Sequence, residues 1–164
     1  MASPLSASPR SLAAVGMTQG GFYNHFESKD ALIAEACSSG FARSVQNWNA
    51  NAMSARPPVE GALKRLFSYY LARKPLEQGC PMVALDAAPH HASAALNEAY
   101  REGVEQLFST FSDIARADPA CPLSEKELVF GFAAMVGANI LSRATGDKKW
   151  SAGVERGLFE AREG

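Results

Sequence analysis

Apolar positions recur along this chain with the spacing of an α-helix, and no stretch shows the strict alternation of a half-buried strand. The pattern predicts long helices over residues 28–48, 58–73, 93–117 and 124–143, and a last helix from about residue 151. An apolar segment over residues 79–85 leads into a further short helix that ends near Pro89. The sequence therefore predicts an all-α fold without internal repeats.

Helix starts are marked by residues that satisfy the free amide groups of a first turn. Ser28 and Ser124 stand at cap positions, and Ser124 with Glu127 forms a capping box. Asparagines and the Pro57-Pro58 pair predict a loop over residues 47–58, and a second, proline-containing loop covers residues 118–123. These signals place the helix boundaries more firmly than the apolar pattern alone.

The helix expected over residues 124–143 is apolar on nearly every side. Its apolar residues include Leu128, Val129, Phe130, Phe132, Met135, Val136, Ile140 and Leu141. A helix that is apolar all round must be covered all round, and a chain of 164 residues has few other elements to do so. We therefore expect part of this helix to contact a second subunit.

Composition limits the classes of function. With 47% hydrophobic and 20% charged residues the chain can bury a sizeable core, and a net charge of −1 does not resemble a strongly basic nucleic-acid binder. A dimer that touches a short DNA site with few phosphate contacts remains compatible with this charge. The longest apolar run, Leu128–Leu141, is too short for a membrane span and contains two glycines.

The sequence shows no pattern of a catalytic, cofactor or metal site. No Ser-His-Asp order, nucleotide loop or spaced carboxylate pair is present, so we expect a protein that is not an enzyme and binds no cofactor. His90 and His91 diverge on a helix and lack a third ligand. Cys37, Cys80 and Cys121 lie far apart, which indicates buried thiols in a reducing, cytoplasmic setting. A redox role for Cys80 is the less favoured alternative.

The most specific pattern lies between Gly16 and Ala36. Gly16 supplies a tight turn, Thr18 can cap the short helix that follows, and Ser28 caps the next helix. This order is typical of the second half of a helix-turn-helix, in which the first residues of a recognition helix face base edges in the major groove. The alternative is a helical hairpin whose Phe22 and Phe26 are ordinary core residues.

The run Ala14–Leu32, AVGMTQGGFYNHFESKDAL, resembles the recognition-helix signature of the TetR family of bacterial transcriptional regulators. The resemblance implies that Tyr23, His25 and Lys29 contact phosphates. It implies that Thr18, Gln19, Gly20 and Asn24 lie toward the groove, where glutamine and asparagine can bridge the N6 and N7 atoms of adenine. For Gln19 and Asn24 a solvated helix face is an equally good interpretation.

The same resemblance implies a division into a head with its linking helix, residues 1–45, and a ligand-binding and dimerisation body, residues 46–164. Gly79-Cys80-Pro81 is similar to an element of some TetR-like bodies. Candidate residues for an effector pocket are Trp48, Phe67, Tyr70, Met82, Tyr100 and Phe108. Candidate residues for a dimer interface built from the last two helices are Phe130, Ala134, Ala138, Leu141, Val154 and Leu158.

The function implied is a dimeric regulator, a repressor that a small, mostly apolar effector releases from its double-stranded operator DNA, with no membrane partner. TetR-like heads carry one more helix before the helix-turn-helix, for which the fifteen residues before Gly16 leave no room. The head is thus expected to lack its first helix. The alternative function is a dimeric, helical small-molecule-binding module that has lost DNA binding with that helix.

Overall fold

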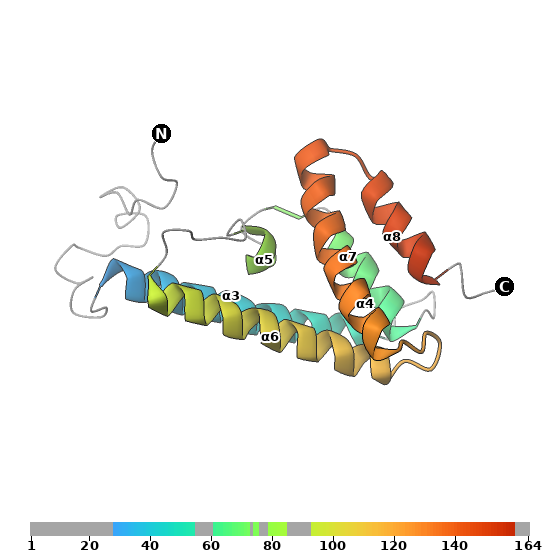
Figure 1. Ribbon diagram of the computed structural model, residues 1–164, viewed down its shortest axis with the longest axis horizontal. Coiled ribbons are helices and arrows are strands. Elements are labelled where there is room, and N and C mark those ends of the chain that lie inside the picture. Colours follow the sequence, from blue (N-terminus) through green and yellow to red (C-terminus); the bar gives the residue numbers. More distant parts are fainter. Residues whose placement is uncertain (1–27, 55–60, 73, 76–78, 85–92, 160–164) are drawn as a thin grey trace.

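The computed structural model describes residues 28–54, 61–72, 74–75, 79–84 and 93–159. The helices in these ranges are α3 (Lys29–Ala52), α4 (Ala62–Leu71), α5 (Pro81–Ala84), α6 (Ala94–Arg116), α7 (Glu125–Thr145) and α8 (Lys149–Phe159), as Figure 1 shows. The described ranges contain no strand. The prediction of an all-α fold is confirmed.

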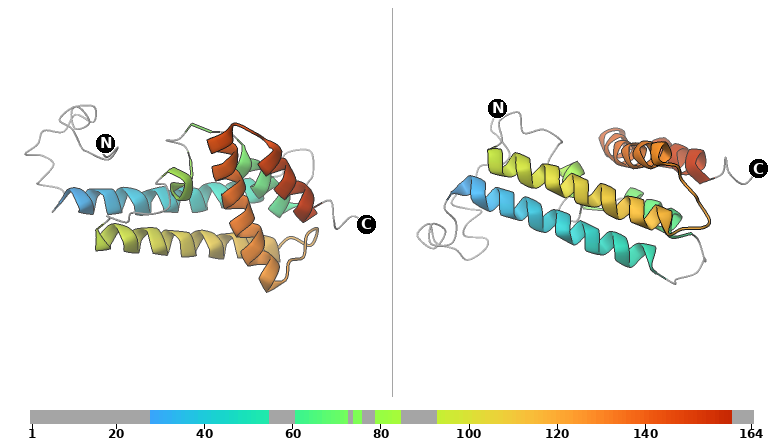
Figure 2. Two further views of the ribbon diagram at one scale, coloured as in Figure 1. Left: turned by 45° about the horizontal axis from the view of Figure 1, so that its top comes forward. Right: turned by 60° about the horizontal axis from the view of Figure 1, so that its bottom comes forward.

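The long helices α3 and α6 lie side by side and run in the same direction (Figures 1 and 2). They approach closely because Gly103 of α6 leaves room for the buried ring of Phe41 on α3. A Cβ atom at residue 103 would lie 2.1 Å from Cδ2 of that ring. The Phe41 ring also meets Tyr100 edge to face, with 5.5 Å between the ring centroids. The register of the two helices thus depends on one glycine.

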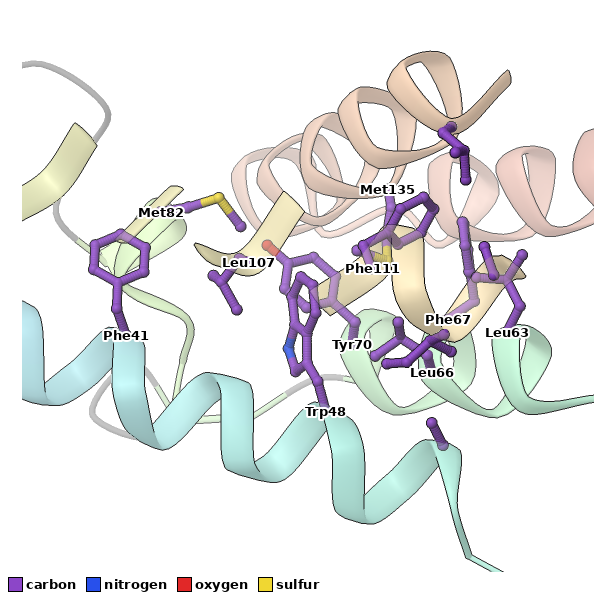
Figure 3. Close-up of a cluster of buried hydrophobic side chains, with 14 of the residues drawn as sticks. Phe41, Trp48, Leu63, Leu66, Phe67, Tyr70, Met82, Leu107, Phe111 and Met135 are labelled. Atoms are coloured by element: carbon purple, nitrogen blue, oxygen red, sulfur yellow. The ribbon is translucent and has the colours of Figure 1, made fainter. Parts of the chain in front are cut away.

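The core lies where α3 and α6 meet α4, α7 and α8. Figure 3 shows Trp48 extending from α3 against Tyr70 of α4, and these rings meet edge to face at a centroid distance of 5.4 Å. Phe67 of α4 lies 6.1 Å from Phe111 of α6 and 5.3 Å from Phe159 of α8, again between ring centroids. Aromatic side chains from every one of these helices therefore share one core.

Side chains close the predicted helix starts as expected. The hydroxyl of Ser28 accepts from the amide of Ala31 at 3.0 Å, which begins α3. Ser124 and Glu127 form the predicted capping box of α7, with the amide of Ser124 donating to the Glu127 carboxylate at 2.8 Å. Gly146 ends α7 with a φ of 71°, a conformation that glycine adopts without strain. The predicted caps at Ser28 and Ser124 are confirmed.

α4 has only ten residues and depends on neighbouring elements at its first turn. Its cap residue, Gly61, offers no side chain, and the amide of Leu63 instead donates to the carboxylate of Asp118 at 2.7 Å. Asp118 is itself buried, in the loop between α6 and α7. The guanidinium of Arg65 donates to the carbonyl of Ala52, the last residue of α3. The loop and α3 thus fix where α4 lies.

Several predicted boundaries are wrong. The helix expected over residues 58–73 is the shorter α4, since Gly61 and Ala72 have extended backbone, and a short helix, α5, lies within the segment 79–85 that was expected only to precede one. Residues 47–52 belong to α3 rather than to a loop, because Trp48 and Ala52 are buried and their packing outweighs the weak helix propensity of the asparagines. The side chain of Asn51 also donates to the carbonyl of Asn47 at 2.7 Å, inside the helix. α8 begins at Lys149, two residues before the expected start.

α7 is, among the described helices, long and apolar enough to cross a membrane when judged by length and composition alone. The sequence argument that no segment approaches such a span was therefore too strict. In the fold, one face of α7 contributes Leu128, Gly131, Met135, Ala138 and Asn139 to the protein interior. Another face stays exposed, so the apolar composition of α7 exceeds what its own chain covers.

Replacement of Gly103 by alanine is expected to destabilise the protein by about 1–3 kcal/mol, because the added methyl group overlaps the buried Phe41 ring. Urea unfolding followed by circular dichroism measures this change. The matched control is Gly153→Ala in α8, where a Cβ atom meets nothing within 4 Å. That variant should be unchanged or up to about 1 kcal/mol more stable, since alanine is the better helix former. Equal effects of the two substitutions would contradict the proposed packing.

Candidate ligand-binding site

Two polar side chains of α7 hold the end of α4. The amide nitrogen of Asn139 donates to the carbonyl of Tyr70 at 2.6 Å. Arg143, one turn further along α7, donates to the side-chain oxygen of Asn139 at 2.9 Å and to the carbonyl of Lys74 at 3.0 Å. The last carbonyl groups of a helix have no partner within that helix, so the bond from Asn139 satisfies a group that α4 leaves open, and the bond from Arg143 holds the chain just beyond the helix.

A narrow cleft of about 30 Å³ lies beside this link, large enough for roughly one small polar group. We call it the basic cleft. It is lined by Arg43, Ser44, Asn47 and Trp48 of α3, by Tyr69, Tyr70, Ala72, Lys74, Gly79 and Cys80, and by Asn139 and Arg143 of α7. Three of these described residues are cationic and none carries a carboxylate.

Lys74 is the most perturbed cation of the basic cleft. Its ammonium nitrogen lies 3.0 Å from the centroid of the Tyr69 ring. Burial, and to a lesser degree the positive charge of Arg143, lower the pKa of Lys74 from 10.5 to about 8. The cleft therefore disfavours a further positive charge even though an aromatic face lies against the amine.

Tyr70 and Cys80 bring neutral polar groups to the same cleft. The hydroxyl of Tyr70 is buried, and it makes no hydrogen bond of acceptable geometry with any described residue. Burial, and to a lesser degree the nearby Cys80 thiol, raise the pKa of Tyr70. Burial also raises the pKa of Cys80, which keeps the thiol protonated and weakly nucleophilic. Ser44 donates its own hydroxyl to the carbonyl of Gly40 at 3.0 Å.

A larger cavity of about 380 Å³ opens between α4, α7 and α8, and we call it the α8 pocket. Its lining comprises Ser68, Leu71, Ala72, Asn139, Ser142, Arg143, Gly146, Lys148, Ser151, Ala152 and Glu155. The hydroxyl groups of Ser142 and Ser151 lie 2.8 Å apart and join α7 to α8. The two cavities share Ala72, Asn139 and Arg143. This volume is in the range of small-molecule sites.

The structure distributes the six candidate pocket residues between the basic cleft and the core. Trp48 and Tyr70 line the cleft. Phe67 and Met82 are buried in the core, and Tyr100 and Phe108 pack against it half-buried. These four residues line neither of the two cavities.

The charged residues of the cleft were missed because sequence reasoning considered aromatic side chains alone. A usable signal was present in the pair Asn139 and Arg143. They stand four residues apart in an otherwise apolar helix, and such a spacing brings two side chains to the same face.

Of the candidate dimer residues, Phe130 and Leu141 are exposed by 69% and 40%. Ala134 and Val154 are half-buried. Ala138 and Leu158 are a correction, since both are buried within their own chain and cannot form a free surface. The actual exposed α7 face consists of Val129, Phe130, Ala133, Ile140 and Leu141, which follow helical spacing.

Most of the candidate DNA-binding residues lie outside the described residues, namely Thr18, Gln19, Gly20, Tyr23, Asn24 and His25. Lys29 is described; it is exposed and is the first residue of α3. His90 and His91 also lie outside the described ranges. Within those ranges no group of three His, Cys, Asp or Glu side chains could hold a metal ion.

The lowered pKa of Lys74 predicts how stability depends on pH. Between about pH 8 and 10.5 the unfolded chain binds more protons at Lys74 than the folded chain, so the cost of burying the charged amine disappears as the pH rises. Lys74→Gln should therefore gain stability relative to wild type below pH 8 and lose that gain by pH 10.5. Urea unfolding at both pH values measures the difference, with Lys126→Gln on exposed α7 surface as the control. If the difference in unfolding free energy between Lys74→Gln and wild type were the same at both pH values, the lowered pKa of Lys74 would be refuted.

Comparisons with known proteins identify a solved structure with a similar fold. No family model matches the chain, and no curated protein matches its sequence. The solved structure of E. coli NemR in its reduced form is similar, with a TM-score of 0.73 and 18% sequence identity. The match covers 90% of this chain and 81% of the NemR chain. The chain therefore shares the helical fold of NemR.

Proposed function

We propose that this protein is a ligand-responsive, DNA-binding transcriptional regulator of the TetR type that acts as a repressor. The observation that carries the proposal is the recognition-helix motif of residues 14–32, which leads directly into α3 at its Ser28 cap. The helical fold shared with NemR over 90% of this chain is compatible with it.

α3 is the element that can connect ligand and DNA. It begins at Lys29, inside the motif, and its residues Arg43, Ser44, Asn47 and Trp48 line the basic cleft. Fourteen residues of helix separate Lys29 from Arg43, a distance of about 21 Å. A ligand that shifts α3 at the cleft also shifts the start of the helix, and with it the recognition helix that the motif predicts.

The proposed repressor acts as a homodimer joined through the exposed α7 face. Val129 and Phe130 are 58% and 69% exposed, which is unusual for large apolar residues that neighbour one another. Ile140 and Leu141 continue the same face three turns later. Pairing of α7 and α8 with their copies in a four-helix bundle would bury it and would space two recognition helices for one turn of DNA.

The second candidate function is a dimeric helical module that binds a small molecule without binding DNA. The two cavities and the exposed α7 face support this function equally well, since the described residues that form them all follow the recognition-helix motif in the chain. DNA binding by the full chain separates the two candidates.

Selection from a pool of random DNA duplexes tests the repressor. We expect the 164-residue protein to enrich a sequence with twofold symmetry, and binding to that sequence to weaken with rising salt. The Tyr23→Ala, Lys29→Ala double variant should lose at least about tenfold in affinity through its phosphate contacts. A folded dimer that enriches no sequence would favour the second candidate.

The dimer has its own test. Phe130→Glu places a charge on the exposed α7 face and should convert the dimer to monomers in sedimentation, with helix content unchanged. Met53→Glu is the matched control, because Met53 is also an exposed apolar residue, at 83%, but follows α3 rather than lying on α7. An intact dimer in the Phe130 variant would exclude this interface.

A further inference from the structure

The basic cleft brings three cationic side chains together, and none of its described lining residues carries a carboxylate. Arg43 comes from α3, Lys74 follows α4 and Arg143 belongs to α7, so three separate segments each bring one cation to the same cleft. Burial, and to a lesser degree the like charge of Arg143, lower the pKa of Lys74 because both disfavour a charged amine in this cleft. A bound anion would relieve both effects at once.

Tyr70 adds a hydrogen-bond donor to these charges. Its side chain is 4% exposed, and its hydroxyl lies beside the Cys80 thiol, a weak acceptor, but makes no well-formed hydrogen bond with any residue that the structure describes. Buried hydroxyl groups are normally bonded, and one left open at a cleft indicates a missing acceptor. Three cations and one free O–H donor are complementary to an oxygen anion.

We propose that the effector is a small organic acid whose carboxylate binds in the basic cleft, between Arg43, Lys74 and Arg143, and accepts a hydrogen bond from Tyr70. This inference rests on the proposed function and names the chemical class of its ligand. The 30 Å³ of the cleft suffices for a carboxylate group and for little else. An acid with a short apolar body, rather than a purely apolar effector, fits these residues.

The α8 pocket receives the rest of the acid. It shares Ala72, Asn139 and Arg143 with the cleft and offers a further 380 Å³. Leu71, Ala72 and Ala152 contribute apolar surface to it. A carboxylate held by Arg143 therefore leaves the apolar part of the same molecule beside side chains that favour it.

Calorimetry and thermal unfolding of the full chain test the inference with defined compounds. Acetate, butyrate and benzoate represent carboxylates with apolar bodies of increasing size, benzamide is the neutral isostere of benzoate, and sulfate is an inorganic anion. We expect benzoate to raise the melting temperature in a concentration-dependent manner, and benzamide to have no effect. Binding should also return the pKa of Lys74, followed by NMR of its side chain, toward 10.5.

Substitution of Tyr70 by phenylalanine distinguishes a ligand contact from a structural role. The free variant should be as stable as wild type or more stable, because a buried hydroxyl without a partner is removed. Its affinity for benzoate should fall about tenfold, the effect of one hydrogen bond to a charged group. Lys74→Gln should weaken benzoate binding by a similar factor. Lys126→Gln, an exposed cation on α7, should leave it unchanged.

Any one of three results would overturn the inference. The first is that no carboxylate of the series binds at a concentration of about 10 mM, which would detect even weak binding. The others are that benzamide or sulfate binds as well as benzoate, or that the Tyr70→Phe variant binds benzoate with the affinity of wild type. None of these measurements contains DNA. Selective carboxylate binding by a protein that selects no DNA sequence would thus support the ligand class and refute the repressor. Selection of a DNA sequence by a protein that binds no carboxylate would support the repressor and refute the ligand class.

Discussion

The attachment of α4 to α7 through Asn139 and Arg143 is the interaction on which the rest of the structure depends. α4 supplies Phe67 and Tyr70 to the aromatic core, yet a helix of ten residues is marginal by itself. Its first turn is held by Asp118, and its end is held by the two α7 side chains that bond to the carbonyls of Tyr70 and Lys74. The position of α4, and therefore the shape of the core around it, is set from outside the helix.

The same two residues also line both cavities. Asn139 and Arg143 line both the basic cleft and the α8 pocket, so the bonds that fix α4 also place a guanidinium where a ligand can reach it. Holding Arg143 near Lys74 disfavours the charged state of that lysine. Clustered cations destabilise the free protein but stabilise a bound anion, and functional sites commonly contain such locally unfavourable groups. In the proposed regulator, ligand binding at the cleft shifts α3 and thereby moves the DNA-binding residues.

Helix order, caps and the capping box could be predicted from the sequence because each depends on residues within one or two turns, such as Ser124 and Glu127. The end of α3 could not, since Trp48 and Ala52 extend the helix by packing against residues distant in sequence. The cleft was missed for the same reason: Arg43, Lys74 and Arg143 come together only in the fold. Ala138 and Leu158 were assigned to a dimer surface because the resemblance places the interface on the last two helices, but the sequence does not show which side of each helix its own chain covers.

The most direct test of the account is the affinity of the protein for benzoate, measured by calorimetry with and without a saturating amount of the DNA duplex that it selects. Binding free energies are reciprocal: if the acid releases the repressor from DNA, then DNA must weaken binding of the acid by the same factor. The account predicts a weaker benzoate affinity on DNA, by the factor with which benzoate weakens DNA binding, typically about 5- to 150-fold. Equal affinities in the two conditions would show that the cleft and the DNA-binding residues are not coupled, which would contradict the account.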